Sequence, residues 1–109
     1  MYANNYNQKG NSLSHLKRYE EALAVYERAT QLNPRDASTY TQKGMALSHL
    51  KRYEEAIVVY EQAIQLNPND DSIKFEKEVI RMQLFLSLLS SKISEMFTQA
   101  LELLKKART

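Results

Sequence analysis

The sequence contains no cysteine, which excludes a disulfide framework, a thiolate metal site and a cysteine nucleophile. A cysteine-free domain suits a reducing compartment, so we expect a cytoplasmic protein. Glycine and proline are also scarce, with two residues of each. So few turn-forming residues favour helices joined by tight connections over a strand-rich fold with many turns.

Long apolar runs are missing as well, and none approaches the length needed to cross a bilayer. The polar segment Met1–Gly10 does not resemble a secretory signal, and we expect no membrane partner. The net charge of +2 is small, and Lys17-Arg18 and Lys51-Arg52 are each followed at once by a tyrosine and two glutamates. Without a concentrated basic patch, nucleic acid is not an expected partner.

An internal repeat dominates what is present. Residues 3–36 align without a gap on residues 37–70, and more than two thirds of the aligned pairs are identical. The run His15–Ala22 recurs unchanged as His49–Ala56, and each copy ends in Gln-Leu-Asn-Pro. Equivalent positions are 34 residues apart along the chain, and we call this separation the repeat period. A fixed period of 34 residues predicts a stack of repeated supersecondary units.

Each copy has the spacing of two amphipathic helices. In the second copy Tyr40, Gly44 and Leu47 recur every three or four residues, and a second such series begins at Tyr53. Only Lys51-Arg52 separates the two series, which leaves room for nothing longer than a tight helix–helix turn. Each copy is therefore expected to be a helical hairpin.

Proline and aspartate mark the ends of the units. Pro34 and Pro68 end the second helix of each copy, because proline disfavours helical conformation in the residue before it. Asp36 and Asp70 then stand where an N-cap carboxylate accepts the first free N–H groups of the next helix. The prediction is a single all-α domain over residues 1–109.

The order of an aromatic residue, a glycine, an alanine–aromatic pair and a closing proline resembles the tetratricopeptide repeat. It is present in the second copy as Tyr40, Gly44, Ala56, Tyr60 and Pro68, and in the first as Tyr6, Gly10, Ala22, Tyr26 and Pro34. There are departures, since tyrosine replaces the usual tryptophan, Lys9 and Lys43 replace leucine, and Leu13 and Leu47 replace tyrosine. The resemblance implies an α-solenoid, a right-handed stack of antiparallel hairpins.

In this family the first helices of the hairpins line a concave groove for a peptide or a partner helix, so the resemblance implies a protein–protein interaction scaffold or adaptor. The implied groove-facing residues are Asn4, Asn7, Gln8, Asn11, Ser14, His15, Ser38, Thr41, Gln42, Met45, Ser48 and His49. Their amides and hydroxyls suit hydrogen bonding to a peptide backbone, although the free face of any surface helix is polar.

Some members of the family clamp the C-terminal carboxylate of heat-shock chaperones with Lys, Asn and Arg side chains. This chain matches those positions at Asn11 only, because Asn7, Gln42, Ser72 and Glu76 occupy the others. A clamp that depends on positive charge is therefore not expected here.

Residues 71–109 do not repeat the pattern. Two repeats are fewer than a stable stack normally needs, so this segment must complete the core or a second chain must do so. It is either one long helix or a divergent third hairpin with a break near Ser90-Ser91. The sequence Phe97-Thr-Gln-Ala100 echoes Tyr60-Glu-Gln-Ala63, and this slightly favours the hairpin.

The same segment is apolar nearly all round in its middle, which exceeds what an outermost helix of a monomer requires. Self-association through it, as a homodimer or larger oligomer, is the alternative function. The candidate interface residues are Leu84, Phe85, Leu88, Leu89, Ile93, Met96, Phe97, Leu101 and Leu104.

No arrangement of residues predicts catalysis. His15 and His49 fall on successive repeats and not on one helix face, and no third metal ligand accompanies them. The members of each glutamate pair, Glu20-Glu21 and Glu54-Glu55, point about 100° apart on a helix and cannot form a two-carboxylate site. Without a nucleotide-binding, hydrolase or metal motif, we expect a protein that is not an enzyme and needs no cofactor or metal.

Overall fold

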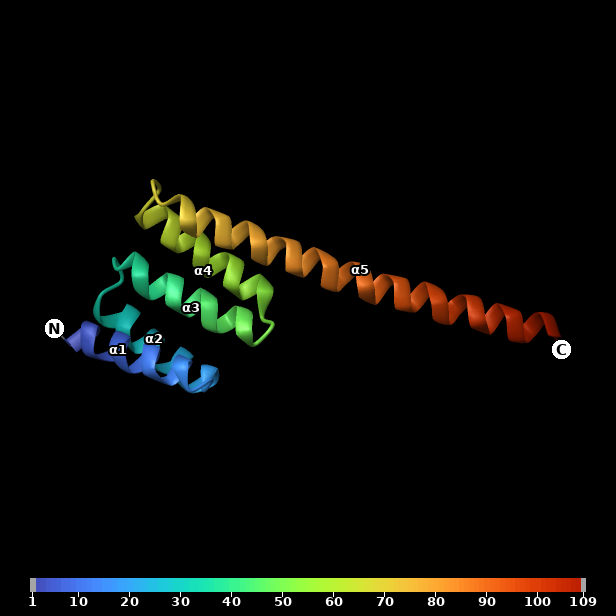
Figure 1. Cartoon of the computed structure of the whole chain (residues 1–109), viewed down its shortest axis with the longest axis horizontal. Helices are drawn as coiled ribbons and strands as arrows, with labels where there is room; N and C mark the ends of the chain where they lie inside the picture. The colour runs from blue at the N-terminus through green and yellow to red at the C-terminus, as the bar shows by residue number, and fades with distance from the viewer. Residues whose placement is uncertain (1, 109) are drawn as a thin grey trace.

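The computed structural model describes residues 2–108, which form five α-helices and no strand. The helices are α1 (Tyr2–His15), α2 (Tyr19–Leu32), α3 (Ala37–His49), α4 (Tyr53–Leu66) and α5 (Asp71–Arg108). Figure 1 shows α1–α4 stacked as two antiparallel hairpins, with α5 packed along α4 and extending far beyond it. The predicted all-helical stack of hairpins is confirmed.

A residue in the left-handed backbone conformation follows the first helix of each hairpin and allows the turn to be short. Lys17 and Lys51 have φ angles of 61° and 60°. In the first turn the N–H of Arg18 donates to the carbonyl of Leu13, and the N–H of Lys17 donates to that of Ser14, both at 2.9 Å. These two bonds close the helix as a Schellman motif, in which the left-handed position is usually glycine.

Replacing Lys51 with glycine is therefore expected to stabilise the protein. Glycine adopts positive φ without the steric cost that a lysine Cβ incurs, and this outweighs its larger entropy in the unfolded chain. We expect the free energy of unfolding, measured by urea denaturation, to rise by about 0.5–1 kcal/mol. Lys74→Gly, inside α5, is the control and should lower it by about 1 kcal/mol. A loss of stability in both variants would contradict the assignment of strain to Lys51.

Aspartate side chains cap α3 and α5 as predicted. The Oδ1 of Asp36 accepts the N–H of Ser38, and the Oδ1 of Asp70 accepts the N–H of Ser72, each at 3.0 Å. The Ser72 hydroxyl also donates to Asp70 at 2.6 Å, and this bond holds the pKa of the Asp70 carboxyl below its usual value. Because that pKa is lowered on folding, the stabilisation is present at neutral pH and is lost as the pH falls through the acid range.

The core lies between the hairpins and depends on small residues. Tyr26 and Tyr60 are the largest fully buried side chains, and each ring covers the glycine of its own hairpin's first helix. A Cβ placed on Gly44 would lie 2.9 Å from Cζ of Tyr60, and one on Gly10 would lie closer still to the Tyr26 ring. Glycine at these two positions allows the two helices of a hairpin to approach each other closely.

Ion pairs recur from one unit to the next and continue into α5. Lys43 pairs with Glu27 of α2, and Lys77 pairs with Glu61 of α4 at 3.6 Å. Both partners of the second pair lie one repeat period after those of the first. The start of α5 therefore occupies the first-helix position of a third unit, where Ile73 and Ile80 are buried and complete the core against α4.

Residues 71–108 form one continuous helix, which is the first of the two predicted alternatives, and the slightly favoured hairpin with a break near Ser90-Ser91 is wrong. No glycine or proline follows Pro68, and the segment is rich in leucine, lysine and glutamate, which favour helix. A serine costs a helix interior only roughly 0.5 kcal/mol relative to alanine, which is too little to break it. The echo of the repeat at Phe97 does not mark a third hairpin.

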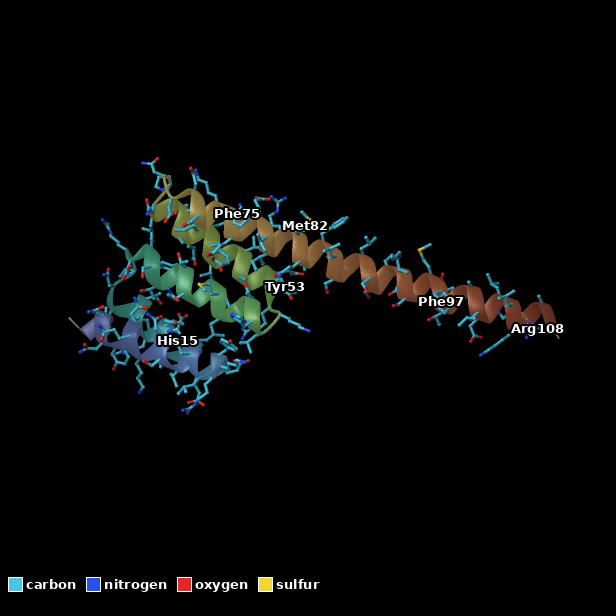
Figure 2. The ribbon with its side chains drawn as sticks, viewed as in Figure 1. His15, Tyr53, Phe75, Met82, Phe97 and Arg108 are labelled. Carbon is cyan, nitrogen blue, oxygen red and sulfur yellow. The ribbon has the colours of Figure 1, made fainter. Side chains whose placement is uncertain are left out.

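The far half of α5 stands free of the rest of the molecule. Every residue from Phe85 to Arg108 is exposed, and the molecule measures 71 × 29 × 20 Å along its principal axes. Figure 2 shows the side chains of this half, including Phe97, surrounded by open space. Despite its length α5 lacks the apolar character of a membrane-spanning helix, as do the other helices of residues 2–108.

Candidate functional site

The first helices of the two hairpins form the walls of a hollow of about 510 Å³. Six residues that were expected to face the groove surround it: Asn11, Ser14, His15, Gln42, Met45 and His49. Lys17, Tyr19 and Ala46 complete the lining. The hollow thus offers a bound chain both hydrogen-bonding groups and apolar surface, and it is the main candidate binding site.

Buried Tyr26 orients the polar residues of α1 in this hollow. Its hydroxyl donates to Oδ1 of Asn11 at 2.6 Å and lies 3.2 Å from Oγ of Ser14. Burial raises the pKa of the Tyr26 hydroxyl, and the hydrogen bond with Ser14 opposes part of that effect. Because the amide oxygen of Asn11 already accepts the hydrogen bond from Tyr26, its amide N–H groups remain available to donate to a bound chain.

The second hairpin has an apolar residue at the position of Asn11. Met45 stands one repeat period after Asn11, so Tyr60, the counterpart of Tyr26, has no asparagine to bond. The Tyr60 hydroxyl instead donates to Oε2 of Glu76 on α5 at 3.1 Å. Burial and the adjacent Glu76 charge together raise the pKa of Tyr60 well above its usual value.

The groove-facing side of the stack becomes more apolar from α1 to α5. Positions one repeat period apart change from Asn7 through Thr41 to Phe75, from Asn11 through Met45 to Val79, and from Ser14 through Ser48 to Met82. Phe75 is 69% exposed and, with Val79, borders a further hollow of about 270 Å³ that α3 lines with Met45, Ser48 and His49.

Sequence reasoning missed this third wall of the groove because the family motif ends at Pro68. The signal that could have found it is the repeat period itself, carried past Pro68 into the unrepeated segment. Projected in this way, α5 supplies apolar side chains where α1 supplies amides.

The remaining expected groove residues are spread along α1 and α3. Ser38 and Thr41 line a hollow of about 230 Å³ beside the start of α5, which Gln42 also borders, whereas Asn4 and Gln8 are exposed near the beginning of α1. Asn7 is only 8% exposed, and its Oδ1 accepts no hydrogen bond from residues 2–108. A buried acceptor without a donor is costly, so an N–H group from a bound chain would be a favourable partner.

The two histidines have different surroundings. The ring of His49 stacks on Tyr19 of α2, with ring centroids 4.5 Å apart and planes inclined by 5°. His15 is exposed at the end of α1 and borders the same hollow. Across residues 2–108 no group of three or more His, Cys, Asp or Glu side chains is placed to hold a metal ion.

A second candidate surface runs the length of α5. Its apolar residues recur at alternating spacings of four and three, which places them on one face of the helix. We call this face the tail stripe and define it as Phe75, Val79, Met82, Leu86, Leu89, Ile93, Met96, Ala100, Leu103 and Ala107. Every member of the stripe is exposed in the single chain.

The residues expected at an oligomer interface fall at four places relative to the stripe. Leu89, Ile93 and Met96 belong to it, and Phe85, Phe97 and Leu104 lie along its edges. Leu88 and Leu101 lie farther round the helix, and all of these side chains are exposed. Leu84 is half-buried and borders a hollow with the α3–α4 turn and Tyr53, so it belongs with the packed part of the molecule.

Comparison with known proteins yields one family and several structures. The model of the tetratricopeptide repeat matches residues 11–84. No curated protein sequence matches the chain.

Three solved structures illustrate the similarity. The first TPR domain of human RPAP3 is 25% identical, with a TM-score of 0.77 over 82% of this chain and 70% of that one. The second TPR of Spaghetti (RPAP3), bound to the HSP90 peptide SRMEEVD, is 26% identical and has a TM-score of 0.74. The match covers 83% of this chain and 82% of that one. The Arabidopsis OM64 TPR domain shares the fold, with 22% identity and a TM-score of 0.72. The match covers 75% of this chain and 68% of that one.

Proposed function

Because the chain belongs to the tetratricopeptide repeat family, we propose that it is a non-catalytic adaptor that binds a peptide or a partner helix in its concave groove. The observation that carries the proposal is the hollow of about 510 Å³ between α1 and α3, where Asn11 offers a donor and Met45 offers apolar surface. Such concave sites with a few oriented polar groups are typical of ligand-binding surfaces.

The gradient of polarity suggests what the groove accepts. We expect a bound segment with polar groups at one end and apolar side chains at the other. Its polar end would lie near Asn7 and Asn11, and its apolar end near Phe75 and Val79. An amphipathic helix or an extended peptide with one apolar anchor has this chemistry.

The ligand is not expected to resemble the HSP90 peptide of the Spaghetti structure. That peptide carries acidic residues toward its end, whereas this chain has Asn7, Ser72 and Glu76 where a carboxylate clamp would use positive charge. We propose recognition through backbone hydrogen bonds and apolar contacts instead.

Replacing Met45 with glutamate is expected to weaken binding at the groove by at least about tenfold, because it introduces a charge into the apolar part of the site. Peptides would first be selected from a displayed random library on the full chain, and their affinities then measured by fluorescence anisotropy. Val58→Glu is the matched control, since Val58 is an exposed apolar residue of α4. Selected peptides that bind both variants as well as the wild type would contradict the groove proposal.

We also propose a second function, self-assembly through α5, because its exposed far half carries the tail stripe. Monomeric proteins rarely leave so long an apolar surface uncovered. Light scattering on the purified chain tests it. A strict monomer at high micromolar concentration would overturn this second proposal and leave the groove proposal intact.

A further inference from the structure

We propose that two copies of the chain pair through the tail stripe as an antiparallel coiled coil centred on Ser91, and that the end of each α5 lies at the apolar end of the other copy's groove. This inference rests on the self-assembly proposed above and names its partner, direction and register. Four observations carry it, namely the period of the stripe, the sizes of the facing residues, the distribution of charge, and the position of the stripe relative to the groove.

The period of the stripe is that of a coiled coil. Alternating spacings of four and three define the core positions a and d of a heptad repeat, and every such position from Phe75 to Ala107 is apolar. At 1.5 Å per residue this seam is about 48 Å long. On the opposite face of the far half Leu88 and Leu101 are interrupted by Ser87, Ser91, Glu95 and Thr98, whereas the stripe is apolar throughout, so the face suited to pairing is the stripe.

The side facing α4 is not the stripe. Ile73 and Ile80, which pack against α4, lie roughly opposite Phe75 and Met82 on a helix that turns about 100° per residue. The stripe is therefore uncovered from its first residue to its last. A second α5 can follow it without displacing α4.

The sizes of the stripe residues select the antiparallel direction. With the copies centred on Ser91, a positions face d positions, so Ala100 faces Met82 and Ala107 faces Phe75. In a parallel pair each residue faces itself. The two copies of each alanine would then leave gaps and the two phenylalanines would crowd one layer, and both effects are destabilising.

Charges at the ends of the stripe favour the same direction. The last turns of α5 carry Lys105, Lys106 and Arg108, which a parallel pair would bring together at one end. The antiparallel register instead places Lys106 beside Glu78 of the second copy, where opposite charges flank the core. The register also brings the two Lys92 side chains together at the centre, and each has Glu95 of its own helix within 3.9 Å to offset that repulsion.

This register joins the tail to the groove. Phe75 and Val79 begin the stripe and also border the hollow of about 270 Å³ that Met45 lines on α3. Leu103 and Ala107 of the second copy would lie against this border. Self-association therefore covers the apolar end of the groove and leaves the end near Asn11 open, so that a ligand needing Phe75 competes with the dimer.

The absence of cysteine makes the direction directly testable. Met82 and Ala100 are exposed in the single chain, so cysteine at either position should leave the fold unchanged. The double variant Met82→Cys/Ala100→Cys is expected to form an intermolecular disulfide under mild oxidation and to run at twice the monomer mass. Within one helix these positions are about 27 Å apart, which forbids an internal bond.

Ala100→Cys alone is the decisive comparison. In the antiparallel pair the two Ala100 positions are also about 27 Å apart and cannot be joined, whereas in a parallel pair they face each other. Ready cross-linking of the single variant would overturn the register, as would a dimer by light scattering whose double variant fails to cross-link. A monomer by light scattering would overturn the self-assembly proposal itself, which distinguishes the two failures.

Discussion

Replacing Tyr60 with alanine is expected to lower the free energy of unfolding by about 3–5 kcal/mol, a large part of the stability of a domain of this size. Tyr60 is 1% exposed and lies at the centre of the cluster that joins α3, α4 and α5. The Tyr60 ring fills the space against Gly44 of α3, so its removal leaves a cavity between the two helices. Urea denaturation followed by circular dichroism measures the loss.

Tyr60→Phe separates the ring from its hydroxyl. It keeps the packing and removes only the hydrogen bond to the half-buried Glu76, so we expect a loss of no more than about 1 kcal/mol. If the alanine and phenylalanine variants lost the same amount, the hydrogen bond and not the packing of the ring would be what holds α5 to the stack.

Most of the stack could be predicted from the sequence because its determinants are local. Pro34 and Asp36 mark the end of one unit and the start of the next, and the cap that Asp36 forms with Ser38 has the expected geometry. The turn at Lys51 follows from the small number of residues between two helical series. Each of these features depends on neighbours within a few residues, so a single sequence contains the necessary information.

The structure of residues 71–108 could not be predicted from local signals in the same way. Ser90-Ser91 is compatible with a continuous helix or with a break. The segment forms a helix because no tertiary contact within residues 2–108 stabilises a hairpin there. The heptad of the tail stripe becomes meaningful once residues 71–108 are known to be one helix, since the same apolar residues have no common face across a turn. The change from Thr41 to Phe75 was hidden for a related reason, because position 75 lies outside the motif that identifies the family.

The groove was anticipated as a set of polar positions, but its internal order was not. Asn7 is only 8% exposed and its Oδ1 accepts no hydrogen bond from residues 2–108, which the polar pattern of α1 alone did not indicate. Tyr26 and Tyr60 occupy equivalent positions, yet one orients Asn11 and the other reaches Glu76. These differences come from substitutions at single groove positions between two copies that share most of their residues.

Replacing Ile93 with lysine is expected to weaken dimerisation by at least about 100-fold, equivalent to about 2.7 kcal/mol. In the antiparallel register Ile93 faces Leu89 of the second copy, so each dimer would bury two unpaired charges beside its centre, and burying an unpaired charge is strongly unfavourable. Because Ile93 is 57% exposed in the single chain, the fold of the monomer should be unaffected, which circular dichroism can verify. Light scattering across a concentration series measures the change in dissociation constant.

Leu88→Lys is the matched control for this prediction. Leu88 is 59% exposed, nearly the same as Ile93, but lies about 140° round the helix from it and away from the tail stripe. The two variants carry the same added charge and lose nearly the same exposed apolar surface, so any general effect of charge on solubility is common to both. Dimerisation should survive Leu88→Lys and be lost in Ile93→Lys, and equal losses in both would place the interface on a broader, non-specific apolar surface of α5.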